Sequence, residues 1–152
     1  MIKLPEQGFT LVELLLVLTI TVMALAVVAP NISSGNQASV LKSAARDVAS
    51  ALRFARGKAL TTQKEALVSI DLQENSYQVT GRDKVYKLSD EIDITLSVSQ
   101  TEQDGVGVGS IRFFPDGSSS GGKITLDLGN FTQELTINWL TGQVEIDVPE
   151  AS

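Results

Sequence analysis

The first thirty residues differ from the rest of the chain in their hydrophobic pattern. From Phe9 to Pro30 the sequence FTLVELLLVLTITVMALAVVAP is almost wholly apolar over 22 residues, and Glu13 is its only charged residue. A helix of this length, at about 1.5 Å per residue, extends roughly 33 Å and is long enough to cross a bilayer. We therefore predict a transmembrane helix over residues 9–30.

A second helical pattern follows, over residues 31–64. Proline, glycine and serine in residues 30–35 predict a break or kink before it, because proline removes a backbone donor and the other residues relax the helix. One stripe at spacings of three and four is apolar and predicts the face that packs on the next domain: Leu41, Ala45, Val48, Leu52, Ala55 and Ala59. A neighbouring stripe is mainly basic, and predicts either a solvated face or a contact with acidic neighbours or anionic lipid: Lys42, Arg46, Ala49, Arg53 and Arg56.

After Lys64 the hydrophobic period changes from 3.6 to 2, as in half-buried strands. Pro115-Asp116-Gly117 and Leu140-Thr141-Gly142 are the clearest turns between the alternating runs. The runs predict short strands near residues 68–72, 77–79, 86–88, 92–98, 111–114, 123–128, 134–139 and 143–148. Strands with one apolar face each form antiparallel sheets that pack on one another and on the helix. The fold class is therefore α+β, with a β domain of two sheets over residues 65–152.

The composition excludes several kinds of active site. The chain has no cysteine and no histidine, which rules out a thiolate metal site, a cysteine nucleophile and a Ser-His-Asp triad. We predict that the protein is not an enzyme and holds no cofactor or metal. Two acidic clusters lack the ligand spacing of a calcium loop, so calcium binding stays open and solvated sheet edges are favoured: Asp90, Glu91 and Asp93, and Glu102 and Asp104.

Charge is divided unevenly along the chain. Residues 31–60 contain five basic side chains against one acidic, whereas residues 65–152 contain five basic against 15 acidic. The net charge of the β domain is therefore −10. A surface that binds nucleic acid is basic, so this charge disfavours a nucleic-acid partner for the β domain.

The residues before the apolar segment bear on how the chain is processed. A conventional signal peptide is cut after its apolar core, whereas the small residue Gly8 comes before it. A cut between Gly8 and Phe9 keeps the apolar helix on the mature chain and creates an α-amino group at Phe9. Glu13 then lies about one helical turn deeper, where an unpaired carboxylate is costly. Its nearest cation is that amine, from the same chain or a neighbouring subunit, so Glu13 is a candidate assembly residue.

The run Gly8-Phe9-Thr10-Leu11-Val12-Glu13 resembles the processing motif of type IV prepilins and type II secretion pseudopilins. The resemblance implies that residues 1–8 are a leader, that a prepilin peptidase cuts after Gly8, and that the amine of Phe9 is methylated. Glu13 matches the membrane glutamate of these helices, and Pro30 matches a proline often found there. The resemblance also implies a pilin-like fold, with one pass through the inner membrane and the C-terminal domain in the periplasm.

Two further segments extend the resemblance over the whole chain. Ile111–Ile124 and Ala51–Ala59 are similar to a strand–turn–strand and a helix end of the protein H family of general secretion, which includes fimbrial-type minor pilins. The Ser-Gly run at residues 118–122 lacks the Gly-Lys-Ser/Thr order of a phosphate loop.

The function that the resemblance implies is a minor pseudopilin, a structural subunit of the type II secretion pseudopilus that supports protein export across the outer membrane. Its implied partners are the prepilin peptidase and other pseudopilins, major and minor. Contact with the secretion pore or with exported proteins belongs to the same expectation. The alternative is a minor pilin of a type IV pilus, in pilus assembly or DNA uptake. The acidic, cysteine-free β domain favours the secretion role.

Overall fold

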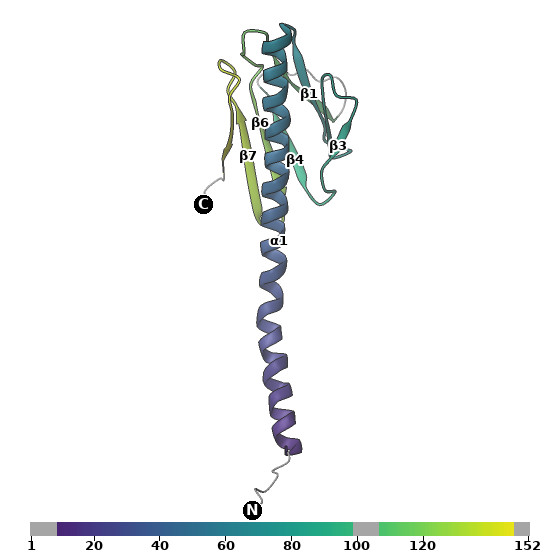
Figure 1. Ribbon diagram of the computed structural model, residues 1–152, viewed down its shortest axis with the longest axis vertical. Coiled ribbons are helices and arrows are strands. Elements are labelled where there is room, and N and C mark those ends of the chain that lie inside the picture. Colours follow the sequence, from purple (N-terminus) through teal and green to yellow (C-terminus); the bar gives the residue numbers. More distant parts are fainter. Residues whose placement is uncertain (1–8, 99–106, 148–152) are drawn as a thin grey trace, which may run out of the picture. The chain divides into compact units, whose positions relative to one another are not determined.

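The computed structural model describes residues 9–98 and 107–147, and for residues 25–35 the backbone only. One helix, α1 (Leu11–Thr62), is followed by eight strands (Figure 1). The strands are β1 (Ala66–Asp71), β2 (Ser76–Val79), β3 (Val85–Lys87), β4 (Asp93–Ser97), β5 (Val108–Phe113), β6 (Gly122–Leu128), β7 (Phe131–Ile137) and β8 (Val144–Asp147). This order confirms the α+β class. The predicted leader and the end of the predicted strand 143–148 lie outside the described residues.

Helix α1 continues through Pro30 without interruption, so the predicted break in the helix is wrong. A proline removes one backbone donor, and the helix tolerates that loss here because strong helix formers such as alanine precede the proline. The chain divides elsewhere, into one compact unit of residues 1–36 and another of residues 37–152. The second half of α1 therefore belongs to the same unit as the strands.

The strands form two four-stranded antiparallel sheets, in the orders β3-β2-β1-β5 and β4-β6-β7-β8. Four hairpins join strands that are consecutive in the sequence: β1–β2, β2–β3, β6–β7 and β7–β8. The last of them confirms the hairpin predicted at residues 140–142. The pairings of β5 with β1 and of β4 with β6 join strands that are distant in the sequence. The chain therefore crosses between the sheets three times, after β3, β4 and β5.

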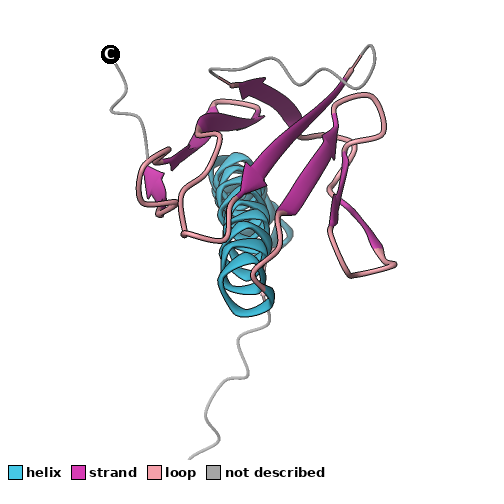
Figure 2. Cartoon of the chain, turned by 90° about the horizontal axis from the view of Figure 1, so that it is seen from above, coloured by secondary structure: helices cyan, strands magenta, loops and turns pink. Residues whose placement is uncertain are grey.

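The second half of α1 and both sheets share one core. Every side chain of the predicted apolar stripe is at most 2% exposed. Alternate strand residues meet the stripe from both sheets, including Val68, Ile111, Phe113, Leu126 and Leu135. Figure 2, a view along the helix, shows the strands arching over one side of it. The prediction that this stripe packs on the β domain is confirmed.

Candidate functional site

The predicted processing site lies next to the start of α1. Gly8 falls outside the described residues, while Phe9 precedes the helix with a side chain that is 82% exposed. Thr10 caps the helix, because its Oγ1 accepts a hydrogen bond from the N–H of Glu13 at 3.3 Å. A threonine followed three residues later by glutamate is the capping-box pattern. The sequence prediction missed this role of Thr10, although the Thr-x-x-Glu spacing carries the signal.

Glu13 lies exposed in the first turn of α1. The partial positive charge at a helix N-terminus favours a carboxylate at this position. Among the ion pairs between described residues, none involves Glu13. In an apolar environment the carboxylate would need a cation from elsewhere. Its predicted pairing with the amine of Phe9 involves a group that exists only after cleavage, and stays a prediction.

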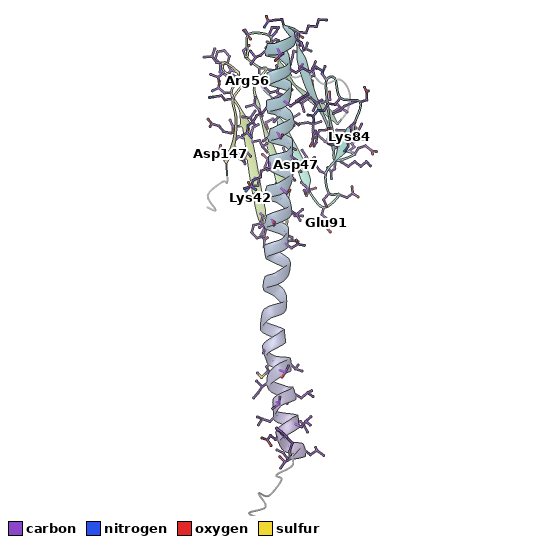
Figure 3. The ribbon with its side chains drawn as sticks, in the orientation of Figure 1. Lys42, Asp47, Arg56, Lys84, Glu91 and Asp147 are labelled. Carbon is purple, nitrogen blue, oxygen red and sulfur yellow. The ribbon has the colours of Figure 1, made fainter. Side chains whose placement is uncertain are left out.

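The first turns of α1 have no buried side. Every large apolar side chain from Leu11 to Met23 is more than half exposed (Figure 3). The hydroxyls of Thr19 and Thr21 donate to backbone carbonyls one turn earlier, at 2.8 and 2.7 Å, so neither needs a partner outside the helix. A helix that exposes apolar side chains all round is typical of a segment covered by lipid or by other helices.

In the part of the chain that the structure describes, no helix has an apolar stretch long enough for a membrane crossing. The predicted span over residues 9–30 includes residues 25–30, whose side chains lie outside the described set.

The basic stripe of α1 has a role inside the domain. The Nη2 of Arg53 donates to the carbonyl of Val144 at 3.0 Å, and the Nε of Arg56 donates to the carbonyl of Gly117 at 3.3 Å. The two arginines thus fasten the β7–β8 hairpin and the turn after β5 to the helix. The sequence predicted either a solvated face or a contact with acidic neighbours or lipid, and neither describes these two arginines. Their acceptors could not be predicted, because they are backbone carbonyls 91 and 61 residues away in the sequence. The other basic residues of the stripe are exposed: Lys42 and Arg46.

The Ser-Gly run after β5 offers no backbone donors to a phosphate. All four N–H groups from Ser118 to Gly121 donate to acceptors within the domain, at 2.8 to 3.1 Å. The N–H and the hydroxyl of Ser118 both donate to the Asp116 carboxylate, which lowers the pKa of Asp116 below its usual value. The run is therefore a structural link between the sheets, in agreement with the rejection of a phosphate loop.

The acidic clusters divide between described and undescribed residues. Asp90 and Glu91 are exposed, and Asp93 begins β4 at one edge of its sheet. Among the described residues, no three carboxylates lie close enough to hold a metal ion. Glu102 and Asp104 fall outside those residues. The position of Asp93 agrees with the predicted acidic sheet edge.

Known proteins with similar sequences share both parts of this architecture. The family model of the type II transport protein GspH matches residues 44–142, and that of the prokaryotic N-terminal methylation motif matches residues 4–29. The chain is 28% identical over 138 residues to the type II secretion system protein H of Xanthomonas campestris pv. campestris, with coverage of 91% of this chain and 81% of that protein.

Two solved structures have the same fold. The minor pseudopilin EpsH from the type 2 secretion system of Vibrio cholerae superposes with a TM-score of 0.59 at 9% identity, over 73% of this chain and 98% of that one. The type IV minor pilin FimU of Pseudomonas aeruginosa superposes with a TM-score of 0.54 at 12% identity, over 73% and 93%. Identities this low show the fold alone, which confirms the pilin-like architecture of a long helix on two antiparallel sheets.

The family match decides between the two functions that the sequence left in view. It covers more than half of the chain and includes the second half of α1 and most of the β domain. Both the protein H resemblance and the methylation motif are thereby confirmed, and the family consists of structural subunits without enzymatic activity. The chain belongs to the family of the type II transport protein GspH, and its function is that of a minor pseudopilin of the type II secretion system.

Proposed function

We propose that the chain is made as a precursor, cut between Gly8 and Phe9 by a prepilin peptidase, and methylated on the new amine of Phe9. The apolar helix over residues 9–30 then anchors it in the inner membrane by a single pass, with the β domain in the periplasm. The observation that carries this proposal is the absence of any buried side along Leu11–Met23, since exposed apolar surface of this extent needs lipid or other helices to cover it. The methylation motif over residues 4–29 supports it independently.

Glu13 is the assembly residue of this proposal. The hydroxyls of Thr19 and Thr21 already have hydrogen-bond acceptors within the helix, and Glu13 is the one acidic or basic residue between residues 9 and 24. When the helix enters a bundle of other pseudopilin helices, the carboxylate pairs with the amine of Phe9 from its own or a neighbouring chain. If the amine belongs to a neighbouring chain, the Glu13 carboxylate is paired only when the two helices pack in the correct register. Incorrect packing would leave an unpaired buried charge, which is costly.

The globular domain supports protein export as a structural part of the assembled pseudopilus. Its partners are the other pseudopilins, major and minor, and at the exposed end of the filament the secretion pore or the exported proteins. The net charge of −10 on residues 65–152 disfavours nucleic acid as a partner of this domain.

The variant Glu13→Ala tests the assembly role. We expect cleavage and methylation to continue, while the amount of the chain recovered in sheared or cross-linked pseudopili falls at least tenfold. Glu91→Ala, which removes an exposed carboxylate of the β domain, is the matched control and should leave incorporation unchanged. Incorporation of Glu13→Ala at the level of the unchanged chain would contradict the pairing.

Cleavage is tested with Gly8→Leu, because a bulky side chain at the cut should block the peptidase. We expect an uncut, membrane-bound precursor, and in the unchanged chain a mass spectrum with a methylated Phe9 at the N-terminus. A mature chain that begins at any other residue would refute the site.

A deletion of the gene tests whether the protein serves type II secretion or a type IV pilus. We expect export of secreted proteins to fall while type IV pili still extend. The opposite result, normal export with loss of pili or of DNA uptake, would favour the minor pilin.

A further inference from the structure

A groove of about 420 Å³ lies between α1 and the segment that contains β3. Asp47 of α1 lines one wall, and Lys84 and Tyr86 line the other. Phe54 and Lys58 lie on the same flank of α1 as Asp47, because they follow it at helical spacings of seven and eleven. Figure 3 shows Lys84 at the flank of the domain where Figure 1 labels β3. The groove therefore lies along the side of α1 and not at its end.

Two of the five basic residues of the β domain form no ion pair with a described residue, and both line this groove. Arg112, Lys123 and Lys87 pair with glutamates at 2.6, 2.9 and 3.5 Å. Arg82 and Lys84 belong to none of these pairs, although the domain has 15 acidic residues. Two neighbouring cations without a carboxylate, in a domain with this excess of acid, indicate a site for an anion from another molecule.

Several contacts fix the position of Arg82. Its N–H donates to the carbonyl of Val79 at 3.0 Å and closes a turn in which Gly81 has φ of +84°. Its guanidinium lies 3.9 Å from the ring centre of Phe54, and its Nη1 donates to the hydroxyl of Tyr86 at 3.0 Å. These side-chain contacts use one of the five N–H donors of the guanidinium. The rest of its planar fork is already in place for a carboxylate, so little order has to be gained on binding.

Two lysines add to this positive charge. The Nζ of Lys84 lies 5.0 Å from the ring centre of Tyr86. The Nζ of Lys58 fills the space beside Gly81, where a Cβ would lie 1.4 Å from it. No ion pair between described residues involves Lys58 either. Because an aromatic ring attracts a cation without carrying a net charge, the cluster of Lys58, Arg82 and Lys84 stays positive.

The other end of the groove carries an acid. Burial, and in second place the nearby Asp47 carboxylate, raise the pKa of the Tyr77 hydroxyl, so Asp47 lies near that ring. Asp47 precedes Phe54 by seven residues, which is about two helical turns or roughly 10 Å along α1. The groove is therefore positive beside Phe54 and negative beside Asp47. A carboxylate of a partner is attracted to the first end and repelled from the second.

Apolar surface lies beside the cations. Phe54 is 38% exposed and Val85 is 52% exposed, and Tyr86 is half-buried between them and the stacked ring of Tyr77. Arginine and tyrosine next to exposed apolar side chains are the residues in which the binding energy of protein–protein contacts is concentrated. The composition of the groove therefore fits a protein surface with an acidic side chain.

We propose that this groove docks a pseudopilin of different sequence, whose acidic side chain binds Arg82 and Lys84 while an apolar neighbour of that side chain packs on Phe54 and Val85. The inference rests on the proposed function, because assembly brings other pseudopilins alongside α1. Exported proteins and the secretion pore meet the exposed end of the filament, whereas the groove lies along the side of the helix. A minor subunit is outnumbered in the filament, so its neighbours are mainly other pseudopilins.

Photo-cross-linking of the full chain, in cells that assemble pseudopili, tests the position of the contact. Photoreactive benzoylphenylalanine in place of Val85 puts the probe in the groove, on an exposed residue. We expect an adduct with another pseudopilin. Mass spectrometry of the linked peptide identifies this neighbour, and should show an aspartate or glutamate close to the linked residue.

Charge reversal tests what holds the neighbour there. Lys84→Glu should lower the yield of the Val85 adduct several-fold, because it places a negative charge beside the partner's carboxylate. Lys42→Glu makes the same change at an exposed lysine on the other flank of α1 and should leave the yield unchanged. Both variants should keep the urea midpoint of the unchanged chain, which excludes unfolding as the cause.

A charge swap identifies the partner residue. The acidic residue found in the linked peptide is replaced by lysine, in cells whose chain carries Lys84→Glu. We expect the yield of the adduct to return to at least half of its original value. A yield that responds to neither the reversal nor the swap would overturn the proposed recognition of a carboxylate.

The remaining outcomes separate this inference from the proposed function. Chains that enter pseudopili but give no Val85 adduct overturn the docking groove and leave the proposed function standing. An adduct only with an exported protein, the secretion pore or a second copy overturns the assignment to a different pseudopilin. Unchanged chains that never enter pseudopili overturn both.

Discussion

The two halves of α1 are one continuous helix in two different environments. From Leu11 to Met23 every large apolar side chain is exposed, whereas from Leu41 to Ala59 an apolar stripe is almost completely buried against the protein's own sheets. The first half therefore depends on lipid or other subunits for its burial, and the second half does not. Both properties suit a filament subunit. The globular domain buries its core without a partner, whereas the first half of α1 is buried only when lipid or other subunits surround it.

The largest expected difference in stability is between leucine-to-alanine substitutions in the two halves of α1. Leu52→Ala removes a fully buried side chain and should cost about 2 to 5 kcal/mol of unfolding free energy. Leu16→Ala truncates an exposed side chain and should change that free energy by less than about 0.5 kcal/mol. Urea unfolding of the full chain in detergent, followed by pulse proteolysis, measures both. Equal losses of unfolding free energy in the two variants would contradict the difference in burial between the two halves of α1.

Glycine substitutions test whether turns that are distant from α1 in the sequence stabilise the second unit. Gly142 has φ of +62°, and a Cβ there would lie 2.3 Å from the carbonyl oxygen of Gly117. We expect Gly142→Ala to cost about 1 to 3 kcal/mol. Gly57→Ala, on the exposed face of α1 with no atom within 4 Å of the new Cβ, should instead stabilise by roughly 0.5 to 1 kcal/mol. The same unfolding assay should show shifts of opposite sign.

A smaller effect should follow from the arginines that fasten turns to the helix. Arg56→Ala removes the hydrogen bond to the carbonyl of Gly117 and should cost about 1 kcal/mol. Arg46→Ala changes an exposed residue of the same stripe and should be neutral within about 0.5 kcal/mol. Hydrogen exchange at the amide of Gly142, which lies beside Arg56, should rise in the first variant alone. Unchanged exchange in both variants would contradict a role of Arg56 in holding the turn to the helix.

The smallest effect should be a dependence of the second unit on acid. The pKa of Asp116 is lowered by the two hydrogen bonds from Ser118, so the folded state favours the ionised carboxylate. Its contribution is fully present above the ordinary aspartate pKa of about 3.9, and is lost as the pH falls through the lowered pKa of the folded state. A carboxyl titration by NMR should show the shift, and Asp116→Asn should remove its part of the acid dependence of unfolding. A carboxyl that titrates at the ordinary aspartate value would contradict the cause.

Much of the fold could be predicted because its signals are local. The apolar stripe from Leu41 to Ala59, the change of period after Lys64 and the turns at residues 115–117 and 140–142 all depend on residues that are near neighbours in the sequence. The break at Pro30 was the wrong prediction, because a single missing donor does not outweigh the helix formers before it. Thr10 was missed despite its capping-box spacing.

The sequence by itself determined the N-terminal motif, the helix-then-strands order, and the acidic charge that separates the β domain from α1. Only the tertiary structure decided that β5 joins the sheet of β1, that Arg53 and Arg56 bind carbonyls far along the chain, and that β3 and β8 are edge strands of their sheets. The physical reason is the range of each interaction. Periodicity and turns act over a few residues, whereas sheet order and edge exposure depend on which distant strands bury their apolar faces together.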